Sequence, residues 1–179
     1  MPALCRLALT TGLTLPLLAA CGGGGGESFP PACPRPSILR DGADLYRYRG
    51  GGRDLTDLVL QGRITGLGGD CKRNGPKEVL ATVSVGMDLT RGPAATSRTA
   101  DVAYFVAVTD GDQVLDKRVY PLRAEFSENT DRLRLSGDTV ELHLPVTDTK
   151  TAASYQVTVG FQLTPTELDE NRRRQNRRQ

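Results

Sequence analysis

What the chain lacks excludes several kinds of site. It has no tryptophan, its single histidine is His143, and 5% of its 179 residues are aromatic. One histidine and no Cys-x-x-Cys pair leave a zinc site without enough ligands. There is no Gly-x-Ser-x-Gly elbow for a hydrolase nucleophile and no His-Glu-x-x-His helix for a metalloprotease. The sequence therefore predicts no catalytic constellation, no metal and no other cofactor.

The net charge of +2 conceals an uneven layout. Five arginines lie near the C-terminal end: Arg172, Arg173, Arg174, Arg177 and Arg178. Between Cys21 and Glu170 the chain has 17 basic and 21 acidic residues, a charge of −4. This balance gives no indication of a basic binding face on the domain, which argues against nucleic acid as a partner.

One run of residues is strongly apolar, from Leu7 to Ala20, and a single positive charge, Arg6, precedes it. As a helix, its 14 residues would extend about 21 Å, short of the roughly 30 Å core of a bilayer. The pattern is typical of a secretory signal peptide rather than a membrane span.

The run ends in Leu18-Ala19-Ala20-Cys21, which resembles the lipobox of bacterial lipoproteins. The resemblance implies that residues 1–20 are a signal peptide, that Cys21 is lipidated, and that the protein is anchored on the periplasmic side of the bacterial cell envelope. Gly22 resembles the pattern sorted to the outer membrane, where Asp would resemble retention at the inner one. The alternatives are an ordinary secretory peptide cleaved after Ala20 and a buried apolar helix.

Residues 21–32 then read as a tether. Gly22–Gly26 is an unbroken glycine run, and this composition predicts a flexible coil between a lipid and a domain. A phosphate-binding loop does not fit, because these glycines neither follow a strand nor open a helix.

Cysteine use supports the same interpretation. Cys5 would leave with the signal peptide and Cys21 would carry lipid, which leaves Cys33 and Cys71. Export to an oxidising compartment predicts a disulfide between them. Closing a loop over 38 positions would constrain the unfolded chain by roughly 4 kcal/mol. The alternative, a metal site, lacks further ligands.

From Leu55 onward apolar side chains recur at every second residue, which indicates half-buried strands. The clearest segments are 58–64, 79–89 and 155–163. Val102–Val108 is apolar on both phases, which suits a central strand covered on both sides or a strand that switches sheets. Weaker segments at 43–48, 114–122 and 123–126 bring the expected total to seven or eight short strands.

Two Gly/Asp pairs predict hairpins. Gly137-Asp138 suits a type II′ turn that places Leu135 opposite Val140 and Arg134 opposite Glu141. Asp110-Gly111 predicts a second hairpin, whose loop length the sequence leaves open. Two further glycine-rich segments, Gly50–Arg53 and Gly66–Asp70, are interpreted as loops rather than ligand cradles.

These elements predict an all-β fold: an antiparallel two-layer β-sandwich (immunoglobulin-like) over residues 33–164. Thr164-Pro165-Thr166-Glu167 is a capping box with proline at the first helical position. It predicts a short helix at the start of the polar segment 165–179. Leu168 is the one strongly apolar residue of that segment, so we expect little of the helix to be buried.

His143 is the one candidate for a catalytic base. It stands on the polar phase of its predicted strand, beside Glu141 and across from Arg132, while Leu142 is on the apolar phase. This placement favours a solvated histidine over a member of a nucleophilic triad.

Asp110, Asp112 and Asp116 resemble the opening of a calcium-binding loop. The rest of that pattern is missing, because Leu115 stands where glycine is required and Pro121 where a bidentate glutamate is required. Turn formation alone explains the first two aspartates.

Beyond the lipobox, Gly51–Asp57, Arg91–Ala95 and Gly160–Leu168 resemble segments of a group of bacterial envelope lipoproteins. That group has no assigned activity, so the resemblance implies an anchored envelope protein and transfers no functional residue.

We therefore expect a non-enzymatic, lipid-anchored structural or interaction module that contacts an envelope protein. The alternative is a small-ligand or glycan binder that uses strand-connecting loops, chiefly Gly66–Pro76 and Leu89–Ser97. An acid-base hydrolase built on surface carboxylates is a third, weaker alternative. We expect the five arginines, Arg172 to Arg178, to make a weak electrostatic contact with an anionic surface. The alternative for them is a solvated, disordered end.

Overall fold

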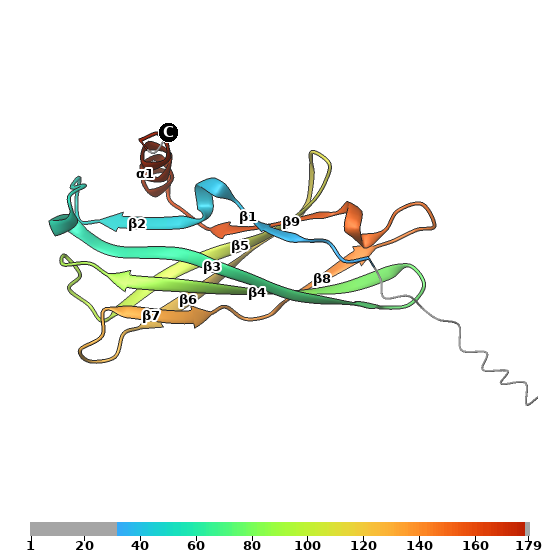
Figure 1. Cartoon of the computed structure of the whole chain (residues 1–179), viewed down its shortest axis with the longest axis horizontal. Helices are drawn as coiled ribbons and strands as arrows, with labels where there is room; N and C mark the ends of the chain where they lie inside the picture. The colour runs from blue at the N-terminus through green and yellow to red at the C-terminus, as the bar shows by residue number, and fades with distance from the viewer. Residues whose placement is uncertain (1–31, 178–179) are drawn as a thin grey trace, which may run out of the picture.

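The computed structural model describes residues 32–177. The predicted signal peptide, the lipidated Cys21, the glycine tether and Arg178 lie outside these residues. The described chain forms two β-sheets packed face to face, with one helix at its C-terminal end (Figure 1). This confirms the predicted all-β, two-layer sandwich.

Nine strands form the sheets of the described part: β1 (Pro36–Ile38), β2 (Asp44–Tyr48), β3 (Leu58–Arg73), β4 (Glu78–Arg91), β5 (Thr99–Asp110), β6 (Gln113–Glu125), β7 (Arg132–Ser136), β8 (Val140–Pro145) and β9 (Gln156–Phe161). The helical elements are three 3-10 turns and one α-helix: η1 (Arg40–Gly42), η2 (Leu55–Asp57), η3 (Ala152–Ser154) and α1 (Pro165–Asn176).

Sheet A has the strand order β1-β9-β5-β6, and sheet B has the order β2-β3-β4-β7, with β8 also paired to β4. All pairs are antiparallel except β1 with β9, where Pro36 lies beside Val157 in a parallel register. The sandwich is therefore not purely antiparallel. After β1 the chain turns through η1 and enters sheet B as β2 (Figure 1).

Two strands of sheet B, β3 and β4, are longer than the sequence predicted. β3 has 16 residues and β4 has 14, and β3 includes Gly66–Asp70, which was predicted to be a loop. The prediction was wrong because these glycines serve close packing. A Cβ on Gly68 would lie 2.6 Å from the hydroxyl of Ser84, and one on Gly69 would meet the backbone of Thr82. The glycines let β3 pass close to β4 beyond an irregularity in the ladder at Ile64/Gly66.

The predicted hairpin at Gly137-Asp138 is wrong. β7 and β8 do not pair with each other; they lie end to end along β4, so that Leu135 faces Met87 and Val140 faces Val83. Positive φ angles among the described glycines occur at other positions, so Gly137 lacks the conformation of a type II′ turn.

Packing rather than turn geometry explains the glycine at this position. A Cβ on Gly137 would run into the hydroxyl and ring of Tyr104. The amide of Gly137 donates to the carbonyl of Val85 at 2.9 Å, which keeps the chain on β4 across the break. Tyr104 Oη donates to the Asp138 carbonyl at 3.3 Å.

The second predicted hairpin is confirmed, and its loop length is now defined. Asp110 pairs with Gln113, so Gly111 and Asp112 form a two-residue loop between β5 and β6. Gly111 has a φ of 56°, a conformation that glycine adopts without steric cost.

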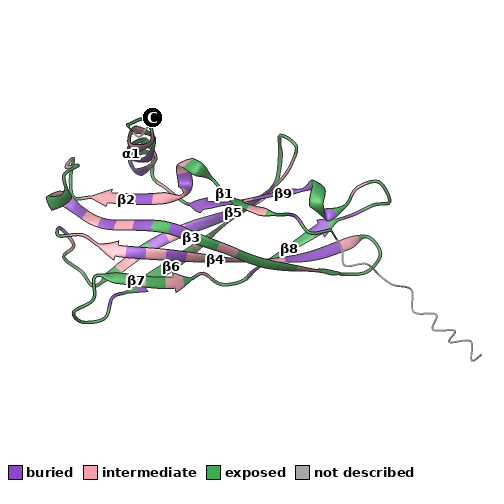
Figure 2. Cartoon of the chain, viewed as in Figure 1, coloured by how far each residue is buried: buried purple, intermediate pink, exposed green. Residues whose placement is uncertain are grey.

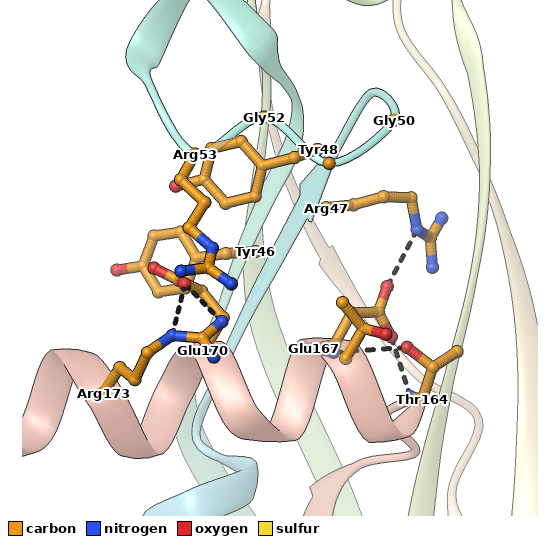
Figure 3. Close-up of a pocket in the computed structure, with 12 residues that line it drawn as sticks. Tyr46, Arg47, Tyr48, Gly50, Gly52, Arg53, Thr164, Glu167, Glu170 and Arg173 are labelled. Carbon is orange, nitrogen blue, oxygen red and sulfur yellow. Dashed lines mark hydrogen bonds and ion pairs between the residues drawn. The ribbon is translucent and has the colours of Figure 1, made fainter.

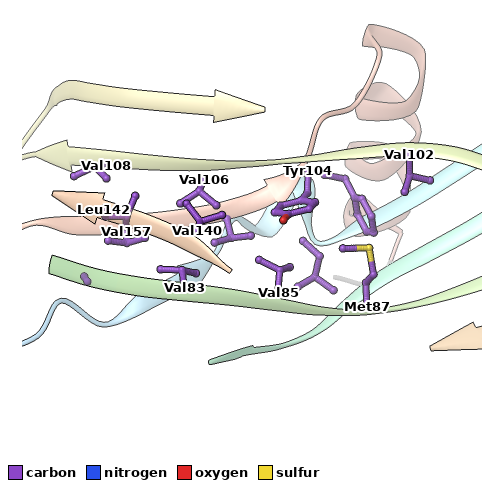
Figure 4. Close-up of a cluster of buried hydrophobic side chains, with 14 of the residues drawn as sticks. Val83, Val85, Met87, Val102, Tyr104, Val106, Val108, Val140, Leu142 and Val157 are labelled. Carbon is purple, nitrogen blue, oxygen red and sulfur yellow. The ribbon is translucent and has the colours of Figure 1, made fainter. Parts of the chain in front are cut away.

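The core lies between the two sheets and follows the predicted alternation. Every second residue of β4, from Val79 to Leu89, is at most 3% exposed. In Figure 4, Val85 and Met87 of β4 point toward Tyr104 and Val102 of β5. Figure 2 shows buried positions recurring along the long strands with less buried ones between them. Burial of each valine, methionine or leucine among them contributes about 1.5 to 3 kcal/mol.

β5 also carries apolar side chains on the face of sheet A that points away from the core, where a glycine leaves space for an aromatic ring. Phe105 is buried although it lies outside the core cluster. A Cβ on Gly160 of the neighbouring β9 would lie 2.9 Å from the Phe105 ring. Lys117 Nζ lies 4.5 Å from the ring centroid, a cation-π contact from β6. Of the two predicted explanations, the strand covered on both sides is therefore the correct one.

Cys33 and Cys71 are joined as a disulfide, with their Cα atoms 5.8 Å apart. Cys71 lies inside β3 rather than in a loop after it. The bond ties the segment before β1 to sheet B at the end of the sandwich where the described chain begins (Figure 1).

Candidate functional site

The helix α1 docks on η1 and β2 through polar side chains. Its three buried residues are Glu167, Glu170 and Asn171, while Leu168 is partly exposed. The low apolar content predicted a helix that buries little. Instead, its inner face is formed by charged and amide groups: Glu167 and Asn171 bond to the sandwich, and Glu170 pairs with arginines of the helix itself and its C-cap.

The capping box predicted at the start of α1 is confirmed. The Thr164 hydroxyl accepts from the Glu167 amide at 3.3 Å, and the Thr164 amide donates to Glu167 Oε2 at 2.9 Å. The other carboxylate oxygen of Glu167 accepts from Arg47 Nε at 2.9 Å. One glutamate therefore both caps the helix and ties it to β2.

Glu170 gathers three guanidinium groups around a carboxylate that is 4% exposed. Arg173 and Arg174 lie 2.9 and 2.8 Å from its oxygens, and Arg177 lies 3.6 Å away. Burial alone would raise the pKa of Glu170, but the hydrogen bonds from Arg173 and Arg174 outweigh it and lower that pKa below 4.5. Glu170 is thus a fixed anion that orients its arginines.

Arg174 also joins the helix to the two tyrosines of β2. Its guanidinium lies 3.9 Å from the centroid of the Tyr46 ring and 5.9 Å from that of Tyr48, and it donates to the Tyr48 hydroxyl. A cation on an aromatic face contributes about 0.5 to 2 kcal/mol, depending on desolvation.

Asn171 connects α1 to the backbone of the edge strand. Its Nδ2 donates to the carbonyl oxygens of Asp44 at 2.6 Å and of Asp41 at 2.8 Å. Gln175 adds a bond to the Arg40 carbonyl at 3.1 Å. Because β2 ends the strand order of sheet B, α1 covers a sheet edge that would otherwise be open to strand addition.

The docked helix leaves a cleft of about 320 Å³ between α1, β2 and the glycine turn after β2. We call it the α1 cleft; its lining is Tyr46, Arg47, Tyr48, Gly50, Gly51, Gly52, Arg53, Thr164, Thr166, Glu167, Glu170 and Arg173. Figure 3 shows Glu167 and Glu170 on the helix and Tyr48 and Arg53 on the opposite wall. Gly50 has a φ of 59° and shapes the turn.

The cations of the α1 cleft outnumber its carboxylates. Arg53 is exposed, and no acidic group of the described chain pairs with it. Arg173 uses two nitrogens on Glu170, which leaves its third nitrogen for another acceptor. The arrangement can accept an anion; its two carboxylates are engaged by arginine and hold those arginines in place.

A second hollow, of about 350 Å³, lies between β6 and β8 and has a different character. Its lining mixes apolar side chains, such as Leu144, with the charged Asp116 and Arg118. The α1 cleft has more converging polar groups, the feature that fixes a ligand's orientation. It is therefore the stronger candidate.

The predicted arginine contact residues divide into several roles. Arg172 pairs with Asp41 at 3.0 Å, and Arg173, Arg174 and Arg177 surround Glu170. Helix α1 continues to Asn176, so the alternative of a disordered end does not hold for the first three of them. Their contact with an anionic surface stays a prediction.

His143 is exposed, as predicted, but its neighbours differ. It lies across from Leu80 rather than Arg132, because β8 pairs with β4. Its Nδ1 lies 3.0 Å from Glu78 Oε1, and this hydrogen bond lowers the pKa of Glu78.

The three aspartates of the rejected calcium pattern do not converge. Asp110 accepts from Lys150, and Asp116 pairs with Arg118 at 3.0 Å. No group of three potential metal ligands was found within residues 32–177.

The loops predicted for ligand binding are only partly loops. Gly66–Arg73 belongs to β3, so the turn there is limited to residues 74–77, at the disulfide end. The segment after Arg91 does form a loop, and Ala95 and Ser97 line a smaller hollow of about 220 Å³. Arg47 borders both this hollow and the α1 cleft.

Sequence reasoning missed Tyr46, Arg47 and Arg53 as members of a site. One signal was present: Glu170 precedes Arg173 and Arg174 by three and four residues, the spacing of ion pairs on a helix. That spacing predicts paired arginines, although it does not say that the helix folds back on β2.

Among the helices from residue 32 to residue 177, none combines the length and apolar character that a bilayer span requires. Comparisons of the chain with protein-family models, curated proteins and solved structures found no match.

Proposed function

We propose that this protein is a lipid-anchored, non-enzymatic interaction module of the bacterial cell envelope. In this proposal Cys21 carries the acyl anchor on the periplasmic side of the outer membrane, and residues 22–32 connect it to the sandwich. The contact surface is the end of the sandwich that carries α1.

The layout of the described domain is the observation that carries the proposal. The chain enters beside the Cys33–Cys71 bond, whereas α1 and the α1 cleft lie toward the other end (Figure 1). β3 runs between the two regions, from Leu58 beside Tyr48 to Cys71. At about 3.3 Å per residue this separates them by about 40 Å. A domain anchored at one end and carrying its cleft at the other suits a contact made away from the anchor.

The same layout bears on the arginines of α1. Arg172 to Arg177 lie on the cleft side, far along β3 from the point where the tether enters. In this proposal these arginines therefore lie away from the membrane that holds the anchor. An anionic surface on the opposite side of the domain is the easier one for them to contact. Their pairing with Asp41 and Glu170 offsets part of their charge, so we propose only a weak contact.

The second candidate function is a small-ligand or glycan binder, and the α1 cleft is the observation that favours it. Its volume of about 320 Å³ lies at the lower end of the range for small-molecule sites, roughly 300 to 1,000 Å³. The two candidates share the anchor and differ in what the cleft end contacts.

Site-specific photo-crosslinking in cells separates them. A crosslinking amino acid replaces Arg53, on the cleft, or Lys77, exposed at the disulfide end, and adducts are identified by mass spectrometry. The proposal expects a recurring envelope protein from position 53 and not from position 77. Equal adducts from both positions would contradict it. No protein adduct at position 53, with a co-purifying small molecule, would support the binder instead.

A further inference from the structure

We propose that the α1 cleft binds a saccharide that carries a carboxylate or phosphate group. The inference rests on the second candidate function, the small-ligand or glycan binder, and deepens it; its evidence is the cleft alone and does not depend on the anchor.

Charge around the cleft favours an anion. Three guanidinium groups line it, those of Arg47, Arg53 and Arg173. Two carboxylates of the lining oppose them, those of Glu167 and Glu170, and both are already paired with arginine. Three against two leaves one positive charge in the lining, and partial burial of the site limits its screening by salt.

The arginines are held in position before any ligand arrives. Glu170 fixes Arg173 and Arg174, and Glu167 fixes Arg47, at 2.8 to 2.9 Å. Each engaged arginine uses only part of its five N–H donors, so the remainder are oriented at little further entropic cost. Arg53 has no ionic partner within the described chain and supplies the cation that a ligand would neutralise.

The rest of the lining suits a sugar ring rather than a bare ion. Tyr48 presents an aromatic side chain (Figure 3), and Thr164 and Thr166 line the cleft from the start of α1. Gly51, also in the lining, is exposed, and a Cβ on it would meet nothing within 4 Å. Aromatic surface beside hydroxyls and guanidinium groups offers contacts for the ring, the hydroxyls and the anion of one acidic saccharide.

Shape argues against an extended acidic peptide. A peptide that binds in this region by strand addition would need the edge of β2. Asn171 donates to the carbonyl of Asp44, the first residue of β2, and Gln175 donates to the carbonyl of Arg40 in η1, just before that strand. The helix therefore blocks strand addition and leaves a compact cleft.

Titration calorimetry on the full chain in detergent tests the proposal. The probes are digalacturonate, glucose 6-phosphate, neutral maltose, inorganic phosphate and a glutamate-rich peptide. We expect one or both acidic saccharides to bind, more weakly as salt increases, and maltose to bind at least tenfold more weakly.

Matched variants place the binding in the cleft. Arg53→Glu should weaken saccharide binding at least tenfold, because it replaces the unpaired cation with an anion. Arg73→Glu makes the same charge change at the disulfide end and should leave affinity within twofold. Thr166→Trp should also weaken binding by filling the cleft from an exposed position of α1. Thermal unfolding checks that each variant is folded.

Several results would overturn the proposal: no saccharide binding, equal binding of maltose, tighter binding of inorganic phosphate or the peptide, or equal losses in Arg53→Glu and Arg73→Glu. None of them bears on membrane anchoring or on the crosslinking pattern, so failure here is distinguishable from failure of the proposed function.

Discussion

The side-chain amide of Asn171 donates a 2.6 Å hydrogen bond to the backbone carbonyl of Asp44, on an edge strand of sheet B. It joins residues 127 positions apart in the chain. Together with the bond to Asp41, it is the part of the α1 interface that a single substitution removes most selectively.

Asn171→Ala should loosen α1 without unfolding the sandwich. Two carbonyls at a partly buried contact lose their donor, and leaving a buried acceptor without a partner costs about 1 to 3 kcal/mol. Hydrogen exchange should become faster in α1 and β2 and stay unchanged in β4 and β5. The control is Asn176→Ala, at an exposed position near the end of the same helix. Unchanged exchange in α1 of the first variant would show that Asn171 does not hold the helix.

The pairing of Glu170 predicts an acid-sensitive helix contact. Its pKa in the folded protein is lowered from 4.5, and the hydrogen bonds from Arg173 and Arg174 outweigh the opposing effect of burial. The stabilisation by Glu170 is therefore present above pH 4.5 and is lost as the pH falls through the folded-state value. Glu170→Gln should be less stable than the parent at neutral pH, and the difference should shrink in acid.

Urea unfolding at a series of pH values measures this difference. Asp169→Asn is the matched control, because Asp169 is the exposed neighbour of Glu170 on α1. A stability difference for Glu170→Gln that is constant with pH, or equal to that of the control, would contradict the assigned role.

Cysteine pairs can test the register of β7. Asp88 and Arg134 are direct cross-strand partners with a 3.0 Å ion pair, so Asp88→Cys with Arg134→Cys should form a disulfide on oxidation. Arg134→Cys with Glu141→Cys should not, because β7 and β8 lie end to end. Peptide mapping without reductant identifies the bonds. Linkage of the second pair rather than the first would contradict this register and support the hairpin predicted from the sequence.

The sequence predicted those features of the fold that depend on residues close together in the chain, and it failed where the cause lies at a distant residue. Alternation from Val79 to Leu89 and the Thr164–Glu167 capping box depend on near neighbours in the chain, and both are confirmed. The turn predicted at Gly137 was wrong because glycine is needed there to make room for the side chain of Tyr104, more than thirty positions earlier. The requirement for glycine was visible, but its cause was a distant side chain.

The candidate site was hidden for a similar reason. Its lining comes from two segments, Tyr46–Arg53 and Thr164–Arg173, that meet only after the last helix folds back. Each segment alone suggests something plainer: a weak strand with a glycine turn, and a polar capped helix. Because α1 docks beside β2 through polar residues, the contact produces no apolar periodicity that sequence analysis could detect.

Removal of the Cys33–Cys71 bond should destabilise the domain while preserving its fold. For a separation of 38 residues, the loop-entropy relation gives a loss of about 4 kcal/mol. Cys33→Ala with Cys71→Ala should show this loss in urea unfolding, and reductant should have the same effect on the parent. The double variant is its own control, since reductant should not change it. A parent that does not respond to reductant would contradict the disulfide.

Fractionation of Cys21→Ser tests the central claim, the lipid anchor, most directly. Each buried acyl CH₂ contributes about 0.8 kcal/mol, and no helix within residues 32–177 could replace the anchor by spanning a bilayer. The parent should sediment with membranes. Cys21→Ser should move to the soluble periplasmic fraction with its circular dichroism spectrum unchanged. A folded variant that stays in the membrane pellet at high salt would contradict the account.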